Sequence, residues 1–125
     1  MSKITMNAMR RSLLAGAAGL VLAAGAQAQG TLKIGEINSY KAQPAFLEPY
    51  KKGMELAVDE INASGGLLGR KVELLTRDDN ANPGDAVRAA EELLTREKVD
   101  VLTGSFLSNI GLALTDFAKQ KKTFF

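Results

Sequence analysis

The residues best suited to bind a ligand lie where a strand-like segment runs into a helix-like one. Ser108 combines a hydroxyl group with the backbone N–H groups of Asn109 and Ile110 at an expected helix start, and such a place binds carboxylates. The alternative is that the hydroxyl only caps its own helix. Gly104, at the end of the preceding strand-like segment, lets the backbone approach a ligand closely, or only provides the turn that a strand end needs.

Two aromatic residues follow the first strand-like segment, and one acidic residue lies within it. Tyr40 and Phe46 are placed so that a ring could cover a bound molecule. Phe46 also fits the apolar stripe of its own helix, so it could equally belong to the core. Glu36 lies within the strand itself, where an acid is unusual, and it could face solvent or point toward a cation.

Several kinds of chemistry are excluded or unsupported. The chain of 125 residues has no cysteine and no histidine, so it has no thiolate nucleophile and lacks the commonest metal and acid–base side chain. The acidic run at 78–84 begins like a calcium loop, but Pro83 stands where the loop needs glycine and Ala89 where it needs glutamate. The glycines at 65–71 lack phosphate-loop spacing, and no G-x-G-x-x-G follows the first strand. We therefore predict no catalytic residue, metal or cofactor.

The first 28 residues have the three parts of an export signal. A basic head containing Arg10 and Arg11 is followed by an uncharged run at 12–25, and Ala26-Gln27-Ala28 offers small residues for cleavage between Ala28 and Gln29. The apolar run of about 14 residues is shorter than the roughly 20 that a membrane span needs. The paired arginines are also similar to a twin-arginine signal, so both the Sec and the twin-arginine route stay open. We expect a periplasmic product.

The formal net charge of +2 comes from this segment. Three of the 16 basic residues and no acid lie in it, so the other 13 basic and 14 acidic residues carry a net charge of −1. Such a balance does not favour nucleic acid as a partner.

Strand-like and helix-like segments alternate after residue 30. The predicted strands are 31–38, 72–77, 99–104 and a short one at 123–125. The predicted helices run from Phe46 to the Gly65-Gly66 pair, from 83 to 97 and from 110 to 121, with Asn82 and Ser108 as N-caps. The residues expected to be buried on the last two helices are Ala86, Val87, Ala90, Leu93, Leu94, Leu114, Phe117 and Ala118.

This order predicts an α/β fold with three layers, in which helices cover both faces of a parallel sheet. Ligands of such folds bind beyond the carboxyl ends of the strands. Here that edge is formed by the segments 38–46, 78–82 and 104–109.

Four motifs in this order resemble the N-terminal lobe of the branched-chain amino acid (Leu/Ile/Val) binding type of periplasmic binding protein, which has the type I fold. They are A-x-x-E-I-N-x-x-G-G at 57–66, L-G-R-K at 68–71, D-D-N-x-x-P at 78–83 and V-D-V-L-x-G at 99–104, followed by Ser108. Members of this family are the solute-binding components of ABC importers. The resemblance covers nearly everything after the signal.

The resemblance implies a longer protein with two hinged lobes, of which residues 29–125 are an incomplete N-terminal lobe. It implies that Ser108 matches the serine that holds the ligand carboxylate and that Phe46 falls near an aromatic position of the pocket. The loop at 38–44 departs from the family, because it lacks the usual Ser/Thr-Gly-Pro turn. The implied partners are a small solute such as an amino acid or a related carboxylate or amide, and the permease subunits of the inner membrane. The full-length protein is expected to be a monomer and not an enzyme.

Two other functions stay open. The same fold serves as the ligand-sensing lobe of receptors and regulators, although cytoplasmic regulators carry a basic helix-turn-helix where this chain has a signal. A secreted hydrolase would have to rely on carboxylates or on a Ser/Lys pair, and no such cluster is evident.

Overall fold

The computed structural model describes residues 30–125. The predicted signal segment and its cleavage site between Ala28 and Gln29 lie outside the described residues. None of the helices within residues 30–125 is long and apolar enough to cross a membrane.

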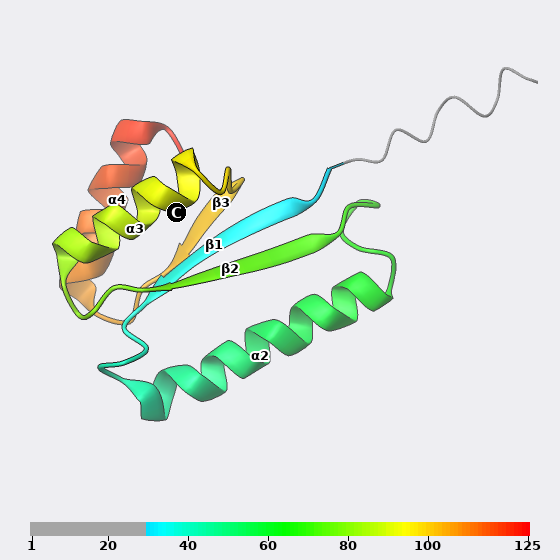
Figure 1. Ribbon diagram of the computed structural model, residues 1–125, viewed down its shortest axis with the longest axis horizontal. Coiled ribbons are helices and arrows are strands. Elements are labelled where there is room, and N and C mark those ends of the chain that lie inside the picture. Colours follow the sequence, from blue (N-terminus) through cyan, green and yellow to red (C-terminus); the bar gives the residue numbers. More distant parts are fainter. Residues whose placement is uncertain (1–29) are drawn as a thin grey trace, which may run out of the picture.

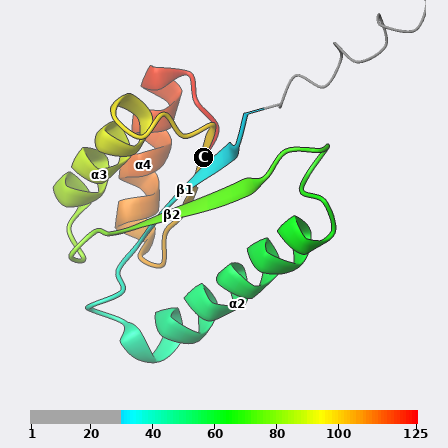
Figure 2. The same cartoon turned by 45° about the vertical axis from the view of Figure 1, so that its right-hand side comes forward.

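Three parallel strands form a sheet in the order β2-β1-β3, with helices on both of its faces. Figures 1 and 2 show α2 alone on one face and the pair α3 and α4 on the other. The bounds are β1 Leu32–Asn38, α2 Pro44–Ala63, β2 Val72–Asp78, α3 Pro83–Thr95, β3 Val101–Gly104 and α4 Ser108–Lys121. The predicted α/β class with three layers is confirmed.

The differences from the predicted bounds occur mostly at element ends. α3 ends at Thr95 and β3 begins only at Val101, because the Val99 N–H donates back to the Leu93 carbonyl at 3.1 Å and closes a turn. The predicted fourth strand does not form as a strand. Its segment nevertheless lies beside β3, since the Leu102 N–H donates to the Phe124 carbonyl at 2.9 Å.

The dry core lies between the sheet and the pair α3 and α4. Ile37 from β1 and Leu102 from β3 are almost completely buried there, together with Leu93 of α3 and Ile110 and Leu114 of α4. The predicted core residues of α3 and α4 are buried, except that Val87 and Leu94 are half-buried at its margin.

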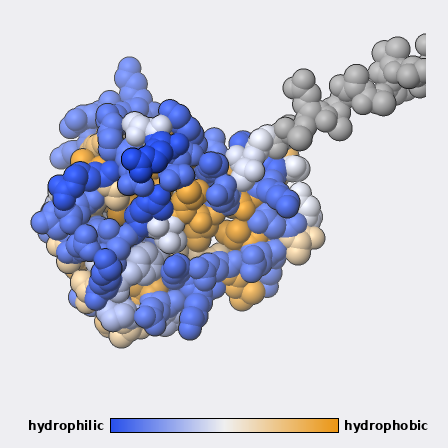
Figure 3. Space-filling view, in the orientation of Figure 1, coloured by the Kyte–Doolittle hydropathy of each residue, from blue (hydrophilic) through white to orange (hydrophobic). Residues whose placement is uncertain are grey.

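The opposite face is covered more loosely than the apolar stripe of α2 predicts. Only Leu47 of this helix is buried, while Tyr50 and Ile61 are 43% and 36% exposed. A groove of about 260 Å³ separates the stripe from Ile34 and Leu74 of the sheet. Figure 3 shows hydrophobic side chains at the surface between the sheet and this helix.

Local signals end α2 and begin α3 as predicted. Gly66 has φ +84°, its N–H donates to the Ile61 carbonyl at 2.8 Å, and a Cβ there would lie 2.1 Å from the Arg70 carbonyl oxygen. Asn82 caps α3, because its Oδ1 accepts from the N–H groups of Gly84 at 2.8 Å and Asp85 at 3.1 Å.

The prediction that Ser108 is an N-cap is wrong. Ser108 is already the first residue of α4, Leu107 occupies the cap position, and no side chain caps this helix. The apolar Leu107 is half-buried against the core, and this packing sets where the chain turns into the helix.

Replacing the cap of α3 tests this account of the fold. Asn82→Ala should lower the free energy of unfolding by about 1 kcal/mol, because two N–H groups lose their acceptor. Asn82→Asp keeps an acceptor oxygen and should lose much less. Urea unfolding of the three proteins measures the difference, and equal losses in both variants would contradict the capping role.

Candidate functional site

A cavity of about 260 Å³ opens at the carboxyl edge of the sheet, on the side that faces α2. Its wall is built from the end of β1, the first two turns of α2 and the loop after β3. The wall residues are Asn38, Phe46, Leu47, Tyr50, Gly104, Ser105 and Phe106. The cavity therefore lies at the edge where the sequence predicts a ligand site.

Two aromatic rings form one side of this cavity. The rings of Phe46 and Phe106 stack with their centroids 5.6 Å apart and their planes 26° apart. Phe46 is 64% exposed, so the alternative that it belongs to the core is wrong. An exposed stacked pair beside a cavity presents a flat apolar surface to a ligand.

Gly104 joins β3 to the wall of the cavity. It has φ +127°, and a Cβ at this position would lie only 1.9 Å from the carbonyl oxygen of Ile37. Only glycine allows β3 to end so close to β1. Gly104 thus both provides the turn at the end of β3 and lies in the wall of the cavity.

The start of α4 presents free hydrogen-bond donors beside the same loop. Ser108 and Asn109 are exposed, and their backbone N–H groups have no acceptor among residues 30–125. The Ile110 N–H, expected to be free, instead donates to the Leu107 carbonyl at 3.1 Å. Neither Ser108 nor Asn109 belongs to the cavity wall, which ends two residues earlier at Phe106.

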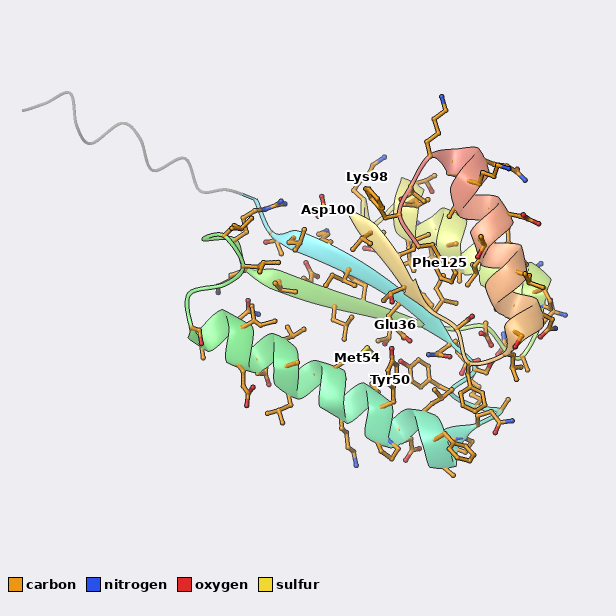
Figure 4. The ribbon with its side chains drawn as sticks, turned by 180° about the vertical axis from the view of Figure 1, so that it is seen from behind. Glu36, Tyr50, Met54, Lys98, Asp100 and Phe125 are labelled. Carbon is orange, nitrogen blue, oxygen red and sulfur yellow. The ribbon has the colours of Figure 1, made fainter. Side chains whose placement is uncertain are left out.

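Glu36 neither faces solvent nor forms an ion pair. Its side chain is fully buried, and it accepts hydrogen bonds from the Tyr40 hydroxyl at 2.5 Å and from Asn38 Nδ2 at 2.8 Å. Figure 4 shows it reaching from the sheet toward α2, where Tyr50 and Met54 point back toward the sheet. Burial raises the pKa of Glu36, although the two hydrogen bonds oppose this shift.

Tyr40 donates a hydrogen bond to Glu36 and does not line the cavity. Burial and the neighbouring Glu36 raise the pKa of its hydroxyl. Its ring lines a second hollow of about 420 Å³, together with the charged side chains of Lys41, Lys51 and Arg77.

A second buried carboxylate joins the loops after β1 and β2. Asp79 is fully buried, and its Oδ1 accepts from the Ser39 hydroxyl at 2.6 Å and from the Ala81 N–H at 2.9 Å. The acidic run after β2 is therefore a hydrogen-bonded turn, as its departure from the calcium-loop pattern indicates. Residues 30–125 contain no group of three or more acidic side chains that could hold a metal ion.

The structure thus brings Gly104 and Phe46 to the cavity and leaves Tyr40, Ser108 and Asn109 outside its wall. The other wall residues, which no sequence motif predicts as site residues, are Asn38, Leu47, Tyr50, Ser105 and Phe106. Tyr50 follows Phe46 by one helical turn, and Asn38 shares the α2 side of β1 with Glu36, so helix and strand periodicity could have indicated both.

The structure is a parallel α/β layer with an aromatic-lined cavity and free N–H donors at its carboxyl edge, where ligands of such folds bind. A family model described as periplasmic binding protein matches residues 15–125. The chain belongs to this periplasmic binding protein family.

Known relatives agree with this assignment. The chain is 32% identical over 112 residues to Leu/Ile/Val-binding protein homolog 7 of Brucella melitensis, which covers 89% of this chain and 28% of the relative. LivJ of Streptococcus pneumoniae, a branched-chain amino acid transporter substrate-binding protein solved with isoleucine, aligns with a TM-score of 0.68 and 31% identity, over 74% of this chain and 27% of LivJ.

A solute-binding protein of an ABC transporter from R. palustris, solved with benzoate, aligns with a TM-score of 0.65 and 32% identity, over 75% of this chain and 26% of that protein. The chain therefore spans about a quarter of the length of the relatives it matches.

The buried carboxylate makes a prediction about pH. A raised pKa in the folded state means that folding favours the protonated form of Glu36, so its contribution to stability is present below its ordinary pKa of 4.5 and is lost as the pH rises through the folded-state pKa. Glu36→Gln should therefore gain stability relative to the wild type between about pH 4 and pH 7.

Urea unfolding at both pH values measures this gain. Glu73→Gln, which removes an exposed carboxylate from the neighbouring strand β2, is the matched control. A Glu36→Gln difference that stays constant or shrinks as the pH rises contradicts the assignment.

Proposed function

We propose that this chain forms the N-terminal lobe of an extracytoplasmic solute-binding protein that captures a small carboxylate-bearing solute, such as an amino acid, for an ABC importer. The proposal rests on one observation: the aromatic cavity and the free N–H groups at the start of α4 lie at the same edge of the sheet. The N–H groups of α4 suit a carboxylate, and the aromatic wall of the cavity suits the apolar part of a solute.

Capture in this proposal is binding without covalent chemistry. The hydroxyl of Ser108 and the N–H groups of Ser108 and Asn109 hold the carboxylate, which is also favoured by the positive end of the α4 dipole. The stacked rings of Phe46 and Phe106 contact the apolar part of the solute. A second lobe, contributed by a longer chain, closes over the solute and excludes water.

The relatives support this choice of solute class. Isoleucine and benzoate, the molecules bound by the two solved proteins, share a carboxylate attached to a compact apolar body. The protein would not be an enzyme, since a carrier has to release its solute unchanged to the permease subunits of the membrane.

The signal-like segment and the family support a periplasmic location. Residues 1–28 would direct export by the Sec or the twin-arginine route, and the mature protein would act in the periplasm as a monomer.

Removing the Ser108 hydroxyl tests the carboxylate site. Ser108→Ala in the full-length protein should weaken solute binding roughly ten- to a hundredfold, about 1.5 to 3 kcal/mol, because a charge-assisted hydrogen bond is lost. Its thermal stability should change little, because Ser108 caps no helix.

Titration calorimetry measures the affinity, and Thr115→Ala removes a hydroxyl from the same helix away from its start as a control. Unchanged affinity in Ser108→Ala would refute the carboxylate site.

Export can be tested separately. Protein purified from the periplasm should begin at Gln29 or its cyclised form in a mass spectrum, because Ala26 and Ala28 suit the peptidase. A periplasmic species that retains Met1 would contradict cleavage.

A further inference from the structure

Asn38 has a buried side chain of which one half has no partner. It is 3% exposed, and its Nδ2 donates to Glu36 Oε1 at 2.8 Å. Its Oδ1 is buried and has no hydrogen-bond partner among residues 30–125. A second buried oxygen, Asp79 Oδ2, is also unpaired, but Asp79 does not line the cavity. Asn38 is thus the residue in which an unpaired buried acceptor and the cavity coincide.

The neighbouring side chains fix which way the amide of Asn38 points. Both carboxyl oxygens of Glu36 accept hydrogen bonds, Oε1 from Asn38 Nδ2 and Oε2 from the Tyr40 hydroxyl, so the NH₂ group of Asn38 lies on the Glu36 side. The Tyr40 hydroxyl donates to the other oxygen of Glu36 at 2.5 Å and thereby holds the carboxylate in place. Asn38 is a wall residue of the cavity and Glu36 is not, and Oδ1 is the atom of the Asn38 side chain that makes no hydrogen bond.

A buried acceptor without a partner is costly, and a donor that arrives in the adjoining cavity would remove this cost. The rest of the wall is mainly apolar, with Phe46, Leu47 and Phe106 around Asn38. The wall therefore joins an apolar surface to an amide side chain with an unpaired acceptor, and polar groups placed in an apolar pocket fix the orientation of a ligand.

We propose that Asn38 Oδ1 accepts a hydrogen bond from the bound solute, so that the site selects carboxylates whose apolar body carries an O–H or N–H donor. This inference rests on the proposed function and narrows its solute class. Asn38 acts as a specificity residue, and Glu36 and Tyr40 act as positioning residues behind it. Analogues without the donor leave the acceptor unpaired, and this is a strong form of discrimination.

The test measures affinity ratios in the full-length protein by titration calorimetry. The matched solutes are benzoate with 3- and 4-hydroxybenzoate, phenylalanine with tyrosine, and leucine with glutamine. The wild type should prefer the donor-bearing member of at least one pair by tenfold or more. Asn38→Leu, which keeps the side-chain volume but removes the acceptor, should abolish this preference by weakening the donor-bearing solute.

Two further variants separate orientation from folding. Glu36→Gln should reduce the ratio in part, because a glutamine lets the Asn38 amide adopt either orientation. Asn62→Leu is the matched control: it removes an amide that bonds the backbone of Val72 at the opposite end of β2, so it should lower stability and leave the ratio unchanged.

Each result decides the matter. A wild type that binds none of the solutes would overturn the proposed function and this inference with it. Binding without a donor preference, or a preference that survives Asn38→Leu, would overturn the inference and leave the proposed function intact. A preference that Asn62→Leu abolishes as fully as Asn38→Leu would also overturn it.

Discussion

The site depends on the burial of β1 from both sides. This strand is paired in parallel with β2 and with β3, so its backbone hydrogen bonds hold it on both edges. Because side chains alternate along a strand, Gly35 and Ile37 face the dry core while Glu36 and Asn38 face α2. A Cβ at Gly35 would lie within 3.0 to 3.2 Å of core side chains, so the core leaves little room for a side chain at this position.

The two faces of the sheet differ in how firmly they are covered. On the α3 and α4 side large side chains are fully buried, and such a close-packed layer resists change. On the α2 side a groove and a cavity remain, and only Leu47 anchors the helix by full burial. The candidate site thus lies on the more loosely covered face, on a strand that is paired along both edges.

Sequence patterns predict correctly those features of the fold that depend on residues close together in the chain. The Gly65-Gly66 pair ends α2 and Asn82 begins α3 through bonds within a few positions, so local rules predict both. The fold class follows from the alternation of these elements. The start of α4 was missed by contrast, because the packing of Leu107 on the core rather than the hydroxyl of Ser108 decides it.

The same distinction explains the candidate site. Phe46 fits the apolar stripe of its helix, and only the distant Phe106, 60 positions later, shows why its ring lies at the surface. The partners of Glu36 are within four positions, yet its burial depends on α2 and on the whole sheet. Sequence patterns indicated the edge of the sheet, but they could not indicate which side chains converge there.

The candidate site has two parts, the start of α4 with its backbone N–H groups and the cavity wall with its side chains. Substitutions would affect these two parts differently. In the proposed function, the carboxylate would be held by the Ser108 hydroxyl together with the backbone N–H groups of Ser108 and Asn109, and almost any substitution preserves the N–H groups. The body of the proposed solute would meet the cavity wall at Asn38, Phe46 and Phe106, while Gly104 allows β3 to lie close to Ile37. In this proposal, substitutions at the three side-chain positions would alter which acid fits without disturbing the carboxylate site, whereas a side chain at Gly104 would clash with Ile37 and separate β3 from β1.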